Sequence, residues 1–186
     1  MKQLPRSWDA GANLIIGNRI PKDYFITKGR GESDITFHAG SYHLALKEAG
    51  IESYNIMTYS SILPGVARLV KKPQSYTHGS VMETIMSVCN MVGGQRGTAG
   101  IIYGWLYDKK TKQKYGGLVC ECSGNISQAE TKHQLKASLN ELYFNGYSVK
   151  YRLKDEKIMI NSFTPKKKFG TVLVGLCFVN YLYPQV

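Results

Sequence analysis

Two adjacent serines lie in the stretch TYSSILPG, where their hydroxyl groups could take part in a reaction or could only stabilise the backbone. Ser60 and Ser61 follow a segment that we expect to be a β-strand, and they precede a loop marked by Pro64. Serine competes well for local backbone hydrogen bonds, so such a pair is typical of a solvated turn. The remainder of the sequence must show whether the pair has another role.

Glu121 is a second residue that could take part in a reaction, because its carboxyl group interrupts the apolar stretch GGLVCECSG. In a strand, successive side chains point to opposite faces, so this carboxylate either faces solvent or is buried with a raised pKa. A buried carboxylic acid that titrates near neutral pH is a good proton donor. The alternation alone leaves both interpretations open.

Metal and nucleotide sites are not indicated by the remaining motifs. Cys120 and Cys122 form a C-x-C pair, but no further cysteine or histidine lies near them at the spacing of a zinc site. The stretch GRGES contains neither a P-loop nor a complete dinucleotide fingerprint. We expect no metal, and we expect the four cysteines to be reduced core thiols, Cys89 and Cys177 included.

Composition predicts one globular domain over residues 1–186, with 43% hydrophobic and 20% charged residues. No apolar run is long enough for a membrane span, and the beginning MKQLPRSWDAG lacks the apolar region of a signal peptide. We therefore expect a cytoplasmic protein without a membrane partner. The net charge of +11 suggests an anionic partner, yet the basic residues are dispersed, which argues against nucleic acid and favours solvated loops.

The first half of the chain predicts strands around one helix. Strands are expected at 13–17 and 23–29, joined by the turn NRIP, and a polar loop GRGESD follows. A helix is expected over 38–49, with Gly50 just past its end. The stretch 53–59 alternates in character and predicts another strand.

The second half predicts a longer β-rich region around a second helix. Strands are expected in SVMETIMSVCNMVG, TAGIIYGWLYD and KYGGLVCECSG. Ser127 and Glu130 form a capping box, a leucine at every third or fourth position keeps the helical period, and Gly146 closes the helix. Three strands are expected to end the chain, in SVKYRLK, KIMINSF and the segment from Phe169. This order predicts an α+β fold in which helices cover an antiparallel sheet sandwich.

Three segments, in this order and spacing, resemble the pyruvoyl-dependent arginine decarboxylase family: PKDYFITKGRGESD, AGIESYNIMTYSSILP and GGLVCECSG. The similarity runs from about Pro21 through the second helix, and N-x-x-x-x-S-S-[IV]-[LM]-P is its most specific motif. The resemblance implies a four-layer αββα sandwich with antiparallel sheets. It also implies a homotrimer with active sites at the subunit interfaces.

The resemblance further implies a proenzyme that cuts itself between Ser60 and Ser61, into a small β chain 1–60 and an α chain 61–186. Ser61 Oγ would attack the Ser60 carbonyl, and the ester would then eliminate to leave a covalent pyruvoyl cofactor derived from Ser61. Asn55 matches the family asparagine implicated in this self-processing. Its side-chain NH₂ is a suitable donor to an oxyanion.

For the mature enzyme the resemblance implies decarboxylation through a Schiff base between the amino-acid substrate and the pyruvoyl group. Glu121 matches the glutamate that this reaction needs, and we assign it as proton donor. Leu46 matches a leucine of the substrate pocket. The expected reaction converts L-arginine to agmatine and CO₂, which serves polyamine synthesis or acid resistance.

One position departs from the arginine-specific pattern, because His43 replaces an aspartate that pairs with the guanidinium group. Imidazole does not replace a bidentate carboxylate. Glu32, Asp34 or Glu52 are candidates for the missing charge. Two alternatives therefore stay open: the same chemistry on a different amino acid, or a non-catalytic basic binding protein on this scaffold.

Overall fold

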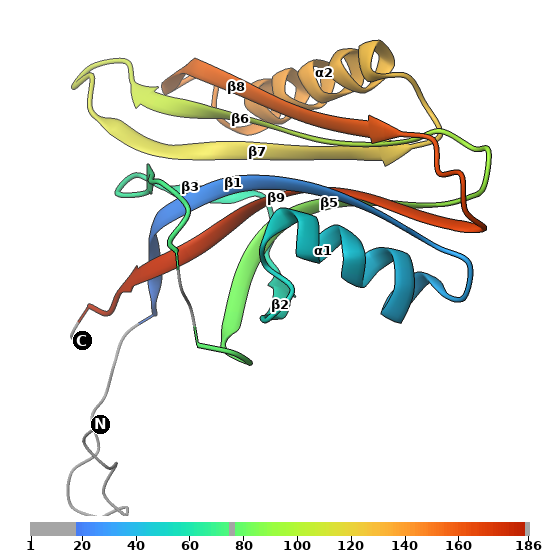
Figure 1. The fold of residues 1–186 in the computed structure, drawn as a ribbon. Helices are drawn as coiled ribbons and strands as arrows, with labels where there is room; N and C mark the ends of the chain where they lie inside the picture. The colour runs from blue at the N-terminus through green and yellow to red at the C-terminus, as the bar shows by residue number, and fades with distance from the viewer. Residues whose placement is uncertain (1–17, 75–76, 185–186) are drawn as a thin grey trace, which may run out of the picture.

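The computed structural model describes residues 18–74 and 77–184, and Figure 1 shows two β-sheets with one helix against each. The strand expected at 13–17 lies outside the described residues. The elements, in chain order, are β1 (Ile20–Ser33), a π-helical turn η1 (Phe37–Tyr42), α1 (His43–Ala49), β2 (Asn55–Thr58), β3 (Ile62–Pro64), β4 (Arg68–Leu69), β5 (Val81–Val92), β6 (Gly97–Asp108), β7 (Lys114–Gly124), α2 (Gln128–Gly146), β8 (Tyr151–Phe163) and β9 (Phe169–Leu182).

The strands form a five-stranded sheet, in the order β2-β5-β9-β1-β4, and a four-stranded sheet, in the order β3-β7-β6-β8. Most neighbouring strands are antiparallel, and the short edge strands β2 and β4 pair in parallel. In Figure 1 the sheets lie face to face, with α1 outside the first and α2 outside the second. The α+β fold expected from the sequence is confirmed.

Three buried clusters lie between these layers. One joins side chains of both sheets, including Tyr24, Tyr103 and Phe178. A second joins α1 to the five-stranded sheet, and a third joins α2 to the four-stranded sheet. Strand alternation explains this division: on β7, Val119 belongs to the cluster between the sheets while Leu118 belongs to the cluster under α2.

Close packing of α1 explains the glycines of GRGES. The expected polar loop is wrong, because Gly29 and Gly31 lie inside β1. A Cβ atom at Gly29 would come within 2.0 Å of the Ala45 carbonyl oxygen, and one at Gly31 within 2.3 Å of the Ser41 carbonyl oxygen. The glycines are needed for the approach of the helical segment to the strand and not for a turn.

The second predicted helix is confirmed, and the first is confirmed in part, because only His43–Ala49 of the expected 38–49 is α-helical and the preceding turn η1 is π-helical. Helix α1 is followed by Gly50, whose φ of 68° is the left-handed conformation that glycine adopts readily. Helix α2 begins after Ser127, whose side chain accepts a hydrogen bond from the Glu130 amide at 3.1 Å. Of the leucines that keep its period, Leu135 and Leu139 are buried. No helix in the described residues is both long and apolar enough to cross a membrane.

Two further boundaries differ from expectation. The turn expected at NRIP is wrong in part, because Ile20 and Pro21 already belong to β1. The two strands expected over 148–163 form the single strand β8. Asp155 within β8 has a φ of 56°, and the pairing of β6 with β8 shifts there, so an irregularity replaces the expected break.

Candidate active site

The Ser60–Ser61 peptide lies where the chain crosses from one sheet to the other. β2 ends at Thr58 in the five-stranded sheet, and β3 begins at Ile62 in the four-stranded sheet, so residues 59–61 form the whole connection. The Tyr59 amide donates to the Thr84 carbonyl of β5 at 2.7 Å. The Ser61 carbonyl accepts from the Val119 amide of β7 at 3.0 Å. The crossing is therefore held to a long strand at each end.

The carbonyl of Ser60 is engaged by a backbone donor within the crossing. The Ile62 amide donates to the Ser60 carbonyl oxygen at 2.9 Å, which closes a three-residue turn centred on Ser61. The non-glycine residues with positive φ in the described chain are Lys112 and Asp155. Ser61 therefore has the hydrogen bond and the negative φ of an inverse γ-turn. This donor polarises the carbonyl on which a nucleophile at Ser61 would act.

The side chain of Ser61 points to Glu121. Its Oγ lies 3.0 Å from both Oε1 and Oε2 of the carboxylate, to which it donates. Glu121 is half-buried on β7, opposite Ile101 of β6. Burial raises the pKa of Glu121, while the hydrogen bond from Ser61 acts in the opposite direction. Of the two interpretations that alternation left open, the structure favours the partly buried acid.

The cysteines beside Glu121 have a different environment. Cys120 and Cys122 contact the cluster under α2, on the other face of β7. Burial, with a smaller contribution from the Glu121 charge, raises the pKa of Cys120 to about 11. Burial also raises the pKa of Cys122, whose Sγ donates to Gln134 Oε1 at 3.1 Å. These thiols are protonated at neutral pH and are poor nucleophiles.

Asn55 lies at the start of β2, away from the scissile peptide. Its Nδ2 donates to the Gly79 carbonyl at 2.8 Å, and its side chain is exposed. Five residues of extended chain span roughly 16 Å, so the Asn55 amide group cannot reach Ser60 along its own strand. In the described chain the hydrogen-bond donor to the Ser60 carbonyl is the Ile62 amide instead.

The two expected substrate residues on α1 face different surroundings. His43 is exposed at the first position of the helix. Leu46 is 7% exposed and packs in the cluster with Phe25 and Leu173. The structure thus brings Ser60, Ser61 and Glu121 together, and it places Asn55, His43 and Leu46 on the five-stranded side of the same chain.

Two of the three candidate carboxylates already have backbone partners. Glu32 Oε2 accepts from the amides of Lys166 and Lys167, at 2.7 and 3.3 Å. Asp34 accepts from the Lys168 amide at 3.2 Å. These acids bind the basic run 166–168, and Glu52 is the candidate for which the structure shows no such role.

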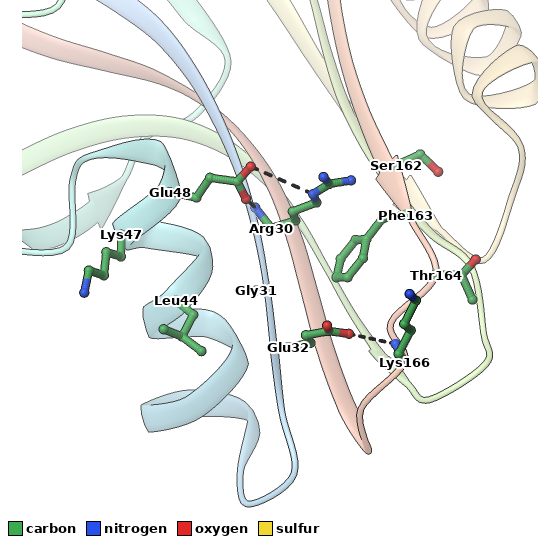
Figure 2. A pocket seen from close by; sticks show the side chains of 10 residues that line it. All are labelled: Arg30, Gly31, Glu32, Leu44, Lys47, Glu48, Ser162, Phe163, Thr164 and Lys166. Carbon is green, nitrogen blue, oxygen red and sulfur yellow. Dashed lines mark hydrogen bonds and ion pairs between the residues drawn. The ribbon is translucent and has the colours of Figure 1, made fainter.

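A hollow with a volume of about 900 Å³ lies beside α1. Figure 2 shows Glu48 paired with Arg30 and Glu32 bonded to Lys166 across it, with the Phe163 ring between them. His43, Leu46, Ser61 and Glu121 are not among its lining residues. The hollow is therefore separate from the Ser61–Glu121 site.

Sequence reasoning missed the Ile62 amide. A main-chain donor has no side-chain signature, and only the i to i+2 geometry of the turn reveals it. Pro64, two residues later, was visible as a loop signal, but it does not specify a γ-turn at Ser61.

Comparison with known proteins defines the family. The family model for pyruvoyl-dependent arginine decarboxylase matches residues 23–183, and the chain belongs to this family. It is 30% identical over 187 residues to "Pyruvoyl-dependent arginine decarboxylase AaxB" of Chlamydia muridarum, covering 89% of this chain and 94% of that protein. The protein of the same name from Chlamydia pneumoniae is also 30% identical, covering 90% and 95%. "Pyruvoyl-dependent arginine decarboxylase" of Methanocella arvoryzae is 38% identical over 71 residues, covering 37% and 42%.

The cofactor of a pyruvoyl-dependent family is a covalent pyruvoyl group. The residues around Ser61 fit such a group. A serine hydroxyl lies beside a half-buried carboxylate, and the preceding carbonyl is already hydrogen-bonded to a backbone amide.

Proposed function

We propose that this protein is a self-processing pyruvoyl-dependent decarboxylase that converts L-arginine to agmatine and CO₂. The chain 1–186 would act as one domain that splits into 1–60 and 61–186. The observation that carries the proposal is the contact between Ser61 Oγ and both oxygens of Glu121, next to the engaged carbonyl of Ser60. Membership of the family supplies the reaction class.

This geometry supports self-processing by the following steps. Glu121 accepts the proton of Ser61 Oγ as that atom attacks the Ser60 carbonyl carbon, and the Ile62 amide stabilises the developing oxyanion. The Ser60–Ser61 C–N bond then breaks, the Ser61 nitrogen takes up a proton, and an ester joins the two residues. Loss of the Ser61 α-proton expels the Ser60 carboxylate. The dehydroalanine left at 61 tautomerises to an imine, and water replaces its nitrogen, which leaves as ammonia.

Glu121 is suited to a second role in the mature enzyme. The pyruvoyl carbonyl supplies an electron sink for the electrons released with CO₂. Conversion of Ser61 removes the hydroxyl that stabilises the ionised carboxylate, while the burial that raises the pKa of Glu121 remains. The pKa of Glu121 is therefore higher after processing than before. The same residue can act first as a base on Ser61 and later as the acid that protonates the substrate Cα.

Assembly would complete the site. Asn55, His43 and Leu46 match family positions, but within one chain Asn55 bonds to Gly79 and Leu46 packs between α1 and the five-stranded sheet. We infer a homotrimer in which a second copy brings these residues to the Ser61–Glu121 pair. The location of Asn55 on the exposed edge strand β2, where Met57 is 51% exposed, supports such an interface.

Membership of the family favours arginine as the substrate. The residue at position 43 and the bonded state of Glu32 and Asp34 favour a less cationic amino acid as the alternative. His43 is exposed and cannot form the bidentate pair that an aspartate offers to a guanidinium group. Glu32 and Asp34 are already bonded to the amides of the 166–168 run. Measurement of CO₂ release across a panel of amino acids decides between the two substrates.

The decisive test of self-processing is intact-mass spectrometry of the purified protein under denaturing conditions. We expect two chains, the larger beginning with a pyruvoyl group at position 61. Ser61→Ala should remain whole, whereas Ser60→Ala, which leaves the nucleophile in place, should still split. A wild-type chain that stays whole, or an alanine variant at 61 that splits there, would contradict the proposal.

A further inference from the structure

Tyr59, the residue before the scissile pair, is held through its backbone amide, its ring and its hydroxyl. Its amide donates to the Thr84 carbonyl of β5 at 2.7 Å. Its ring packs against the cluster between the sheets, with a centroid distance of 5.9 Å to Phe178. Its hydroxyl accepts a hydrogen bond from Arg19 at 3.2 Å.

Arg19 also pairs with Glu83, the neighbour of Thr84 on β5. The Glu83 side chain is only 2% exposed, whereas that of Arg19 is 46% exposed. In residues 18–74 and 77–184, Arg19 is the ion-pair partner of this buried carboxylate, and neither carboxylate oxygen has a hydrogen bond to another described residue. A buried charge is stable only when paired, so Glu83 fixes the guanidinium group, which in turn fixes the Tyr59 hydroxyl.

We propose that Arg19 and Glu83 are positioning residues for self-processing, which hold Tyr59 so that the Ser60–Ser61 peptide keeps its reactive turn. This inference rests on the proposed function. Tyr59 is bonded through its backbone to Thr84, and its hydroxyl is linked through Arg19 to Glu83, the residue beside Thr84 on β5. Ser61 is tied to β7 through Val119 and Glu121. The turn between them is therefore held at both ends, by β5 and by β7.

The role of this pair is geometric, because neither residue contacts the reacting atoms. Attack of Ser61 Oγ on the neighbouring carbonyl depends on the orientation of that carbonyl, and a misplacement of about 1 Å can cost about 100-fold in rate. Loss of the Arg19 hydrogen bond to the Tyr59 hydroxyl would let the first half of the crossing shift while Ser61 stayed on Glu121. We expect slower scission without loss of fold.

The test is a time course of scission after cell-free synthesis, followed by intact mass. Arg19→Gln alone strands a buried charge and can destabilise the protein. The double variant Arg19→Gln/Glu83→Gln removes both charges, so a role limited to charge compensation predicts the wild-type rate. Positioning predicts scission slowed by about 10-fold or more, with an unchanged thermal unfolding temperature. Arg30→Gln, which loses the more exposed pair with Glu48, is the matched control and should split normally.

Tyr59→Phe gives a second measurement should the double variant fail to fold. It keeps the ring packing and the Arg19–Glu83 pair and loses only the phenol oxygen, so positioning predicts a several-fold slower scission at unchanged stability. Wild-type rates in whichever of the two variants folds would overturn the inference and leave the proposed function standing. A wild-type chain that never splits would overturn both.

Discussion

Replacement of Glu121 by glutamine tests the centre of the proposed chemistry. Both carboxylate oxygens lie 3.0 Å from Ser61 Oγ, and glutamine keeps the size of the side chain while losing its basicity. General-base catalysis contributes about 10²–10⁴-fold, which corresponds to about 3–5 kcal/mol of activation free energy. We therefore expect Glu121→Gln to slow scission by that factor, as measured by intact mass over time.

The pH dependence gives the same assignment an independent check. The pKa of Glu121 is raised by burial above its ordinary value of about 4.3. Under the proposed assignment scission needs the ionised form, so its rate should fall as pH drops through the raised pKa. The proposed decarboxylation needs the protonated form, so its rate should fall as pH rises through the pKa that Glu121 has once the Ser61 hydroxyl is gone.

The control for these measurements is Glu141→Gln, which removes an exposed carboxylate on α2. It should leave both rates unchanged. A Glu121→Gln chain that splits at the wild-type rate would refute the base assignment. If the rates of scission and of decarboxylation changed with pH in the same direction, the assignment of Glu121 as base in the first step and acid in the second would be refuted.

Three further predictions concern specificity and stability. His43→Asp should raise kcat/KM for arginine by about 10-fold or more in a CO₂-release assay, because charged hydrogen bonds contribute about 1.5–3 kcal/mol; an unchanged ratio among substrates would contradict this role. Ser127→Ala should lower the free energy of unfolding by about 1 kcal/mol in a denaturant titration, since it removes the α2 cap. Hydrogen bonds from Arg68, then Asn180, lower the pKa of Asp23, so its stabilisation is present above about pH 3.9 and is lost as pH falls through the lowered pKa. Asp23→Asn should remove this loss of stability at low pH, as measured by the thermal unfolding temperature across pH. A variant whose unfolding temperature depends on pH as in the wild type would contradict the role of Asp23.

Local sequence patterns predicted those structural features that depend only on short-range interactions. The α2 cap needs only residues three apart, and Gly50 needs only the end of its own helix. Gly29 and Gly31 were misleading because their reason is non-local. A helix segment 10 to 20 residues later packs on them, and the same glycines in isolation indicate a turn.

The sequence predicted that Ser61 and Glu121 belong to one site, but not how they are arranged. Alternation showed that Glu121 faces away from Cys120 and Cys122, but it did not show which layer lies on either side. The bond to Ser61 requires that the chain change sheets within residues 59–61, which depends on the pairing of β2 with β5 and of β3 with β7. Arg19 and Glu83 are separated by 64 positions, and no periodicity relates them.

One chain holds the groups that the proposed scission uses, namely Ser61, the Ser60 carbonyl, the Ile62 amide and Glu121. If the Ile62 amide is a sufficient oxyanion donor, scission is first-order and its rate does not change on dilution. If Asn55 of a second copy is required, scission slows on dilution as the assembly dissociates. Under the proposed trimer, decarboxylation should depend on assembly in either case, because Leu46 packs between α1 and the five-stranded sheet within one chain. Under this proposal the concentration dependence of the two steps separates the chemistry that one chain contains from the chemistry that assembly completes.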